Sequence, residues 1–319
     1  MTARQGVAPE DSFFAGPQQV DDWRKVLLYD AAAESGMLAA LPASPPVIAD
    51  QLGLDQRAVR ILLDALAVWD VVVAGDDGSY GPGPAMPGDD DEAVLRHHGR
   101  AIRNWSRVID DRLRGAPVAP PAPQPAPGCG QWLDALAVFA RRWAPTLADA
   151  CLAHFPDAGS ALDLGGGHGE YALELARRGL RVTMQDRPEV TALAQADGRM
   201  ADAGVQVFAG DFFEQLPDRS FDLVLLANVA HTYDAAHNTE LYRRILPHIA
   251  AGGGLAITAF VRGRDPRSAI FALQMLSGTG GGDAHTGHDY ARWLEEAGFS
   301  TCQTMDLDHQ PQSLVLAQP

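Results

Sequence analysis

Cysteine is scarce in this chain, and the three cysteines that it has are far apart. Cys129, Cys151 and Cys302 form no C-x-x-C pair, so neither a disulfide framework nor a structural zinc or redox motif is predicted. Reduced thiols are typical of the cytoplasm, where we expect the protein to be. The first residues contain no apolar stretch of the length that a secretory signal needs, which agrees with this expectation.

Long apolar runs and basic charge are also scarce. No run approaches the roughly 18 consecutive apolar residues that a membrane helix needs, so we expect no membrane partner. Against 41 acidic residues there are 25 basic ones, which gives a formal net charge of −16. Such a charge opposes the counterion release that drives binding to nucleic acid. We therefore expect no nucleic-acid partner either.

A proline-rich stretch divides the 319 residues into two parts. Residues 116–130 are rich in proline and alanine. Proline fixes φ and removes an amide donor, which favours extended backbone over helix. A chain of this length is also long for one ordinary domain. We therefore predict a mostly helical N-terminal domain over residues 1–115, a linker over 116–130, and a second domain over 131–319.

The N-terminal part has the pattern of a winged helix. Apolar residues recur at helical spacing on either side of a turn at Gly53, and the valines at 71–73 then lead into Gly-Asp-Asp-Gly. A helix-turn-helix can place its second helix in the major groove of DNA. Residues 40–80, however, contain six Asp and two Arg, a balance that disfavours DNA. We interpret the domain as an interaction module whose helices, near 21–39 and 92–114, offer apolar faces to a second subunit.

Downstream of the linker, strands and helices alternate with short connections. Five apolar segments are predicted as strands: 161–166, 181–186, 205–211, 221–230 and 253–261. Helices predicted over about 188–203 and 241–249 supply the crossovers that parallel strands need. Residues 300–308 and 313–318 lie too close together for another crossover and predict an antiparallel pair. The predicted fold class is α/β: a Rossmann-like, doubly wound and mostly parallel sheet with an antiparallel last strand, beside a smaller helical winged-helix domain.

The first predicted strand ends in an acid that is followed by glycines. Ligands of an open α/β sheet bind beyond the carboxyl ends of its strands, and Asp163 is followed there by Gly165, Gly167 and Gly169. Glycines let a ligand approach the backbone, and the next helix offers free N–H groups to an anion. A dinucleotide fingerprint would require glycine or alanine at position 170, where Glu170 would repel a pyrophosphate.

Two further strand ends supply groups for a nucleoside. Asp186 closes the second predicted strand, where a carboxylate can accept hydrogen bonds from both ribose hydroxyls. Asp211 and Phe212 follow the third strand; the carboxylate can accept from an adenine amino group and the ring can cover the base. A turn-capping acid beside a core aromatic is the alternative for this last pair. The three strand ends together favour a nucleoside cofactor.

These motifs, in this order behind a winged-helix segment, resemble those of class I S-adenosylmethionine-dependent O-methyltransferases of the plant caffeate type and of bacterial antibiotic pathways. The likeness runs from about residue 20 to the end. It implies a homodimer held by the N-terminal domain, with S-adenosylmethionine as the cofactor. The cofactor-binding residues that it implies are Asp163, Gly165, Gly167, Gly169, Asp186, Arg187, Asp211, Phe212 and Asn228.

The fourth strand ends at Asn228-Val-Ala-His231, and His231 takes the position of the family's catalytic histidine. A phenol with a pKa of about 10 is almost entirely neutral at pH 7, and an imidazole with a pKa near 6.5 can remove its proton during attack. His231 is therefore the predicted catalytic base. A histidine that caps the next helix or packs in a turn is the alternative.

The resemblance is weaker around this histidine. The glutamate that orients it in the family corresponds to Ala284 here. A histidine without a carboxylate partner is a weaker base with a less fixed tautomer. Asp283 and His285 are the nearest substitutes, and we favour solvated loop positions for both. An acceptor of low pKa, such as an acidic enol, would need little base.

The acceptor site is expected between the two domains, where ligand sites commonly form. The resemblance implies that Phe139, Trp143, Tyr233 and Met275 line it. The three on predicted helices also fit helical core spacing, and core packing is the more frequent role of such residues. No histidine stands at metal-ligand spacing from nearby acids, so no metal is predicted.

The predicted function is O-methylation of a hydroxylated, phenolic or polyketide-like small molecule in secondary metabolism. The absent carboxylates leave open a family member that uses S-adenosylmethionine for decarboxylation, hydroxylation or a pericyclic step. A winged-helix regulator that senses the cofactor is the second alternative.

Overall fold

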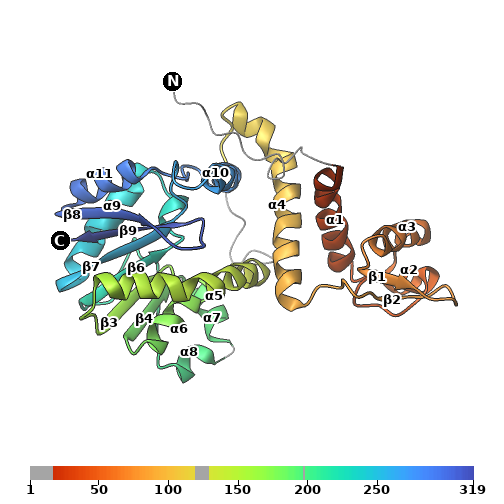
Figure 1. Cartoon of the computed structure of the whole chain (residues 1–319), viewed down its shortest axis with the longest axis horizontal. Coiled ribbons are helices and arrows are strands. Elements are labelled where there is room, and N and C mark those ends of the chain that lie inside the picture. The colour runs from red at the N-terminus through yellow and green to blue at the C-terminus, as the bar shows by residue number, and fades with distance from the viewer. Residues whose placement is uncertain (1–16, 119–128, 197) are drawn as a thin grey trace. The chain divides into compact units, whose positions relative to one another are not determined.

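The protein was analysed as a computed structural model, which describes residues 17–118, 129–196 and 198–319. The chain forms two compact units, Met1–Arg107 and Val108–Pro319, and each is described by itself (Figure 1). The boundary falls inside one helix, α4 (Asp89–Leu113). Most of the predicted linker at 116–130 lies outside the described residues, and the predicted domain limits stay a prediction.

The first unit contains the predicted helix, turn, helix and hairpin. Its elements before α4 are α1 (Pro17–Glu34), α2 (Pro45–Leu52), α3 (Gln56–Ala67), β1 (Val72–Ala74) and β2 (Tyr80–Pro82). Gly53, at φ +66°, ends α2, and the Asp55 side chain caps α3 by accepting from the N–H of Ala58 at 2.8 Å. β1 and β2 pair antiparallel. The assignment of these elements as a winged helix stays a prediction.

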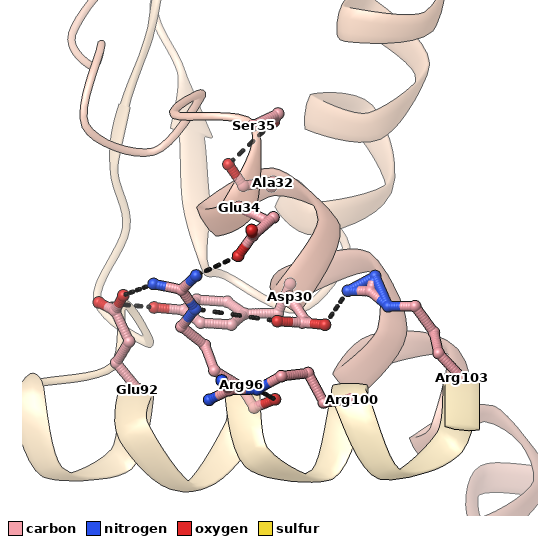
Figure 2. Close-up of polar contacts among 9 residues, drawn as sticks. Asp30, Ala32, Glu34, Ser35, Glu92, Arg96, Arg100 and Arg103 are labelled. Atoms are coloured by element: carbon pink, nitrogen blue, oxygen red, sulfur yellow. Dashed lines mark hydrogen bonds and ion pairs between the residues drawn. The ribbon is translucent and has the colours of Figure 1, made fainter. Parts of the chain in front are cut away.

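A buried carboxylate joins α1 to α4. Asp30 is 1% exposed, and its carboxylate is paired with the guanidinium of Arg103 and lies 3.8 Å from Nε of Arg96 (Figure 2). Arg96 also pairs with Glu34 at the end of α1. Gly99 lets the two helices approach here, because a β-carbon at that position would lie 2.5 Å from the Asp30 side chain. Charge and close approach together hold α1 against α4.

The second unit is built on a seven-stranded sheet of order β5-β4-β3-β6-β7-β9-β8. The first five strands in this order are parallel, β9 is antiparallel to β7, and β8 is antiparallel to β9. The strands are β3 (Ser160–Leu164), β4 (Arg181–Asp186), β5 (Gln206–Ala209), β6 (Phe221–Ala227), β7 (Ile249–Ala259), β8 (Thr301–Asp306) and β9 (Ser313–Gln318). The predicted fold class, including the antiparallel pair at the end, is confirmed.

Helices cover both faces of this sheet (Figure 1). Apolar residues of α5, α6, α7 and α8 share one core with the sheet, and those of α9 and α11 share the other. The helices of this unit after α4 are α5 (Cys129–His154), α6 (Glu170–Arg177), α7 (Pro188–Gln195), α8 (Arg199–Asp202), η2 (Ala230–Thr232), α9 (Ala235–Ile245), η3 (Leu246–His248), α10 (Arg267–Gly278) and α11 (Gly287–Ala297). Every residue of β3 is buried, and all but one residue of β6 is buried, as the apolar run predicts for central strands.

Several predicted elements differ from the structure. The helix predicted over about 241–249 is α9, which ends at Ile245, and the strand predicted from 253 already begins at Ile249. The single helix predicted over about 188–203 is wrong: α7 ends at Gln195, and α8 begins after Gly198, which takes φ +79°. A left-handed glycine interrupts the helical backbone there. The apolar run 221–230 is also too long for one strand, because its end turns into η2 at Ala230.

Loss of the buried carboxylate in the first unit should destabilise that unit. Breaking a buried ion pair leaves uncompensated charge, so Asp30→Ala should lower the free energy of unfolding by about 3–5 kcal/mol. Glu34→Ala is the matched control, because the Glu34 side chain is 67% exposed and an exposed pair contributes about 0–1 kcal/mol. Urea unfolding of both variants measures the difference. Equal midpoints would contradict the assigned role of Asp30.

Candidate active site

The turn between β3 and α6 can be built only with glycine at several positions. Gly165, Gly167 and Gly169 all take positive φ, at +74°, +54° and +78°. A β-carbon at Gly169 would lie 1.7 Å from Cε of Met200, so this turn also packs tightly against α8. The glycines therefore bring bare backbone to the carboxyl edge of the sheet, where a ligand can reach it.

Asp186, at the end of β4, is hydrogen-bonded to this turn. Its Oδ2 accepts from the N–H of Gly167 at 2.9 Å, and its Oδ1 accepts from the N–H of Arg187 at 2.7 Å. Burial raises the pKa of the Asp186 carboxyl, while the two N–H donors act in the opposite direction. The structure thus brings two predicted cofactor positions, at the ends of neighbouring strands, into direct contact.

Asp163 lies fully buried on β3 beside this pair. Burial raises the pKa of its carboxyl to about 7, and the nearby Asp186 charge adds to the effect. An acid that is neutral over part of the physiological range can respond to a cationic ligand, since a positive charge nearby favours the carboxylate.

Glu170 is less exposed to a ligand than the sequence suggests. Its carboxylate is buried and pairs with Arg199 at 2.9 Å and Arg141 at 3.3 Å. The expected repulsion of a pyrophosphate by this residue is therefore weakened, because two guanidinium groups balance its charge.

The third strand end places an aromatic ring beside the glycine turn. Cε1 of Phe212 lies 3.6 Å from where a β-carbon of Gly165 would be. The Phe212 ring meets that of Tyr233 edge to face at 6.2 Å. Asp211 is exposed, and its Oδ1 accepts from the N–H of Phe213 at 2.7 Å. The second carboxylate oxygen of Asp211 can still accept from a ligand.

Asn228, directly after β6, has a strained backbone that is stabilised by contacts from β7, α6 and the residue before β9. Its φ is +59°, its N–H donates to the carbonyl of Thr258 at 3.0 Å, and its side-chain amide donates to the Tyr171 hydroxyl at 3.4 Å. The side-chain amide of Gln312 donates to its carbonyl oxygen. Asparagine tolerates this left-handed backbone better than most residues, and such strain concentrates at functional sites. Sequence reasoning missed Tyr171 and Gln312, which carry no motif.

His231 lies in η2 and is 5% exposed. Its ring meets that of Phe271 from α10 edge to face, with 4.6 Å between the ring centres. Its Nδ1 has no hydrogen-bond partner among the described residues. Burial lowers the pKa of the imidazole to about 3, so it stays neutral at pH 7. The ring can therefore accept a proton, but it is a weak base in this environment.

Asp283 and His285, the nearest substitutes for the absent carboxylate, have side chains that bind other groups. The Asp283 carboxylate pairs with Arg262 at 3.0 Å, and only its backbone N–H reaches the His231 carbonyl, at 3.0 Å. His285 is hydrogen-bonded through Nε2 to the Tyr233 carbonyl at 2.8 Å. A solvated loop position for His285 is wrong, because the residue is 7% exposed.

The residues predicted to line the acceptor site come from separate elements of the second unit. Phe139 and Trp143 stack on α5 with ring centres 5.5 Å apart, and the Trp143 carbonyl accepts from Gln310 at 3.1 Å. Met275 on α10 is 7% exposed. Tyr233 packs against Phe213 with ring centres 5.2 Å apart. Their contact with an acceptor stays a prediction.

Two classes of feature are absent from the part of the chain that the structure describes. No three His, Cys, Asp or Glu side chains there are grouped so as to hold a metal ion. No helix there is both long and apolar enough to cross a membrane.

Known proteins resemble this chain along most of its length. Residues 147–300 match the family model of the O-methyltransferase domain. A 3-hydroxy-5-methyl-1-naphthoate 3-O-methyltransferase of Streptomyces sahachiroi is 28% identical over 86% of this chain and 86% of its own length. A tetracenomycin polyketide synthesis 8-O-methyl transferase of Streptomyces glaucescens is 26% identical over 84% and 85%.

Solved structures share the fold. The structure of mitomycin 7-O-methyltransferase matches with a TM-score of 0.77 at 22% identity, over 94% of this chain and 96% of that one. Human N-acetylserotonin methyltransferase, solved with S-adenosylmethionine, matches with a TM-score of 0.74 at 22% identity, over 94% and 95%.

The fold is that of the Rossmann-like methyltransferase class. The chain carries the O-methyltransferase domain and is an S-adenosylmethionine-dependent O-methyltransferase, as the sequence predicts. The site fits this cofactor, since its glycine turn offers bare backbone and Asp186 stands at the end of the neighbouring strand. The residue assignments within the site stay predictions.

Asp186 should be necessary for tight cofactor binding. Asp186→Ala removes the carboxylate that accepts from the N–H of Gly167 and that is predicted to accept from the ribose, so S-adenosylmethionine should bind roughly tenfold more weakly or worse. Calorimetric titration measures the dissociation constant. Glu214→Ala removes an exposed carboxylate that follows the neighbouring strand β5 and serves as the control. An unchanged affinity in Asp186→Ala would show that the ribose lies elsewhere.

Asp163 should make stability depend on pH in the absence of cofactor. Its pKa is about 7 in the folded protein and about 3.9 in an unfolded chain, so the folded state binds the proton more tightly. Its contribution to stability is therefore lost as the pH rises from about 4 to 7. Asp163→Asn should melt above the parent at pH 8, and the gap should narrow toward pH 4. Asp202→Asn, at an exposed site, should show no such trend.

Proposed function

We propose that this enzyme methylates a hydroxyl group of an aromatic, polyketide-like small molecule in secondary metabolism. The observation that carries the proposal is the similarity, over 86% of the chain, to an enzyme named for 3-O-methylation of a hydroxylated naphthoate. A second relative is named for 8-O-methylation in tetracenomycin polyketide synthesis. The first name gives a hydroxynaphthoate as the acceptor, the second places an O-methylation in polyketide synthesis, and both relatives match most of this chain.

The cofactor, when bound, supplies a methyl group made electrophilic by the attached sulfonium. The glycine turn at Gly165, Gly167 and Gly169 would then lie against the methionine end of the cofactor, because no side chains cover its backbone there. Asp186 and Arg187 would hold the ribose, and Asp211 would accept from the adenine amino group with Phe212 over the ring. Asp163 and Asn228 would complete the site near the amino group at the methionine end of the cofactor. The contact between Asp186 and Gly167 supports this arrangement, because it keeps the ribose site beside the turn.

His231 is the proposed catalytic residue, at the acceptor hydroxyl. Its neutral imidazole would take up or share the proton of the hydroxyl as the oxygen attacks. The low pKa of the His231 ring and the unpartnered Nδ1 favour an acceptor whose hydroxyl is itself acidic, such as one conjugated to a carbonyl group. Phe139, Trp143, Tyr233 and Met275 are proposed as the apolar lining that positions the aromatic acceptor.

We also propose that the protein acts in the cytoplasm as a homodimer held by the domain over residues 1–115. Exposed apolar side chains in this part support a protein partner: Trp23, Val47, Ile61, Val68 and Val73. Sedimentation of the purified chain at several concentrations tests the dimer.

Transfer of labelled methyl groups tests the reaction. Purified protein with methyl-labelled S-adenosylmethionine should label some members of a panel of hydroxynaphthoates and hydroxyanthraquinones. Tight cofactor binding without label in any acceptor would favour the non-methylating alternative, for which the unpartnered His231 is the structural support. Retarded migration of DNA fragments at moderate salt would favour the regulator.

Replacement of His231 should separate binding from turnover. His231→Ala should leave cofactor affinity unchanged and lower turnover roughly 100-fold or more if the imidazole takes the proton. Because burial holds the pKa of this ring at about 3, its protonation should cause no loss of rate between about pH 5 and 8. Steady-state kinetics over this range check both statements. Equal turnover in variant and parent would remove His231 from the chemistry.

A further inference from the structure

One guanidinium in the second unit binds three backbone carbonyls, two at the end of α10 and one just after α4. Nε of Arg112, in the last turn of α4, donates to the Leu276 carbonyl at 2.8 Å. Its Nη2 donates to the Thr279 carbonyl at 3.4 Å, and its Nη1 donates to the Ala116 carbonyl. Leu276 and Thr279 lie at the end of α10, more than 160 residues away in sequence. Arg112 therefore links the end of α4 to the end of α10.

Physical chemistry favours a guanidinium at this position. The last carbonyls of a helix have no partner within the helix and carry the negative end of its dipole. Arg112 meets such carbonyls at the end of α10 and also binds the chain just after α4. A planar fork with five donors can satisfy several acceptors at once, which a single ammonium group cannot do in the same geometry.

The segment that Arg112 contacts packs against His231. Phe271 of α10 packs on the imidazole ring, with 4.6 Å between the ring centres. After α10 the chain turns at Thr279, whose hydroxyl accepts from the N–H of Gly282 at 2.8 Å. A β-carbon at Gly282 would lie 2.5 Å from the His231 carbonyl, and the next N–H, of Asp283, donates to that carbonyl at 3.0 Å.

His231 is thus held through its backbone and by one ring contact, while its Nδ1 has no partner among the described residues. Both kinds of contact come from α10 and the turn 279–283, which we call the backing segment. Because no hydrogen bond at Nδ1 holds the ring within the described residues, a shift of the backing segment would move the imidazole.

We propose that Arg112 is a positioning residue, which fixes the backing segment and thereby the His231 ring relative to the acceptor. This inference rests on the proposed catalytic role of His231. Arg112 acts through the carbonyls of Leu276 and Thr279.

Three single variants separate the role of Arg112 from that of its charge. Arg112→Gln removes the fork and the charge, whereas Arg112→Lys keeps the charge and part of the hydrogen bonding. Arg114→Gln is the matched control, because the Arg114 guanidinium is exposed and Nη1 donates to the Asp110 carbonyl within the same helix end. Calorimetry with S-adenosylhomocysteine measures cofactor affinity, and labelled methyl transfer to the best acceptor of the hydroxynaphthoate and hydroxyanthraquinone panel measures kcat and KM.

The expected result is a loss of turnover without a loss of cofactor binding. Misplacing a catalytic group by about 1 Å costs up to roughly 100-fold in rate, so Arg112→Gln should lower kcat by about 10- to 100-fold. Arg112→Lys should recover part of this loss, and Arg114→Gln should behave as the parent. Cofactor affinity should stay within about twofold of the parent in all three. Equal kcat in Arg112→Gln and Arg114→Gln would overturn the proposal.

Combining the variants tests whether Arg112 acts through His231. In a His231→Ala background, Arg112→Gln should have little further effect on kcat, since the group that Arg112 positions is already gone. An equal fold-loss in both backgrounds would show a general structural role and would also overturn the proposal. If His231→Ala alone retains the parental rate, the proposed catalytic role of His231 is wrong, and the positioning role of Arg112 is wrong with it. If His231→Ala loses turnover but Arg112→Gln does not, only the proposal for Arg112 is wrong.

Discussion

The hydrogen bond between the Gly167 N–H and the Asp186 carboxylate is the contact on which the candidate cofactor site depends. It joins the ends of β3 and β4, which lie side by side in parallel register with Leu164 opposite Gln185. The contact requires the left-handed backbone at Gly165 and Gly167, which residues with a β-carbon rarely adopt. It also brings Asp186 near Asp163, and this proximity, together with burial, raises the pKa of the Asp163 carboxyl. The left-handed glycine backbone and the raised pKa of Asp163 are therefore both linked to the position of Asp186.

The histidine site is organised differently from the cofactor site. There the contacts involve the carbonyl of His231, the face of its ring and the turn behind it, and they fix position without a charged partner for Nδ1. A carboxylate on Nδ1 would fix the tautomer and strengthen the base. Asp283, the residue before Ala284, pairs with Arg262 instead. The second unit thus combines a well-held imidazole with a low proton affinity, which matches an acceptor that gives up its proton easily.

Prediction from the sequence worked best where one local pattern decides the structure. The apolar run at β6, the glycines after β3 and the close pair of strands at the end needed only short-range rules of burial, φ and connection length. It was least accurate where a single residue interrupts a pattern, as at Gly198, where one predicted helix is two. His285 was misplaced because its burial depends on Tyr290 and Trp293 of α11, and a polar loop sequence does not reveal that packing.

The sequence by itself determined the order of strands and helices, the glycine turn, and the acids that end the strands, because backbone preference and hydrophobic period are local properties. Only the tertiary structure decided which distant groups meet: Asp186 with Gly167, Gln312 with Asn228, and Arg112 with the carbonyls of α10. It also decided the proton affinities of Asp163 and His231, since burial and neighbouring charges set a pKa. These effects depend on distances in space, which no spacing along the chain records.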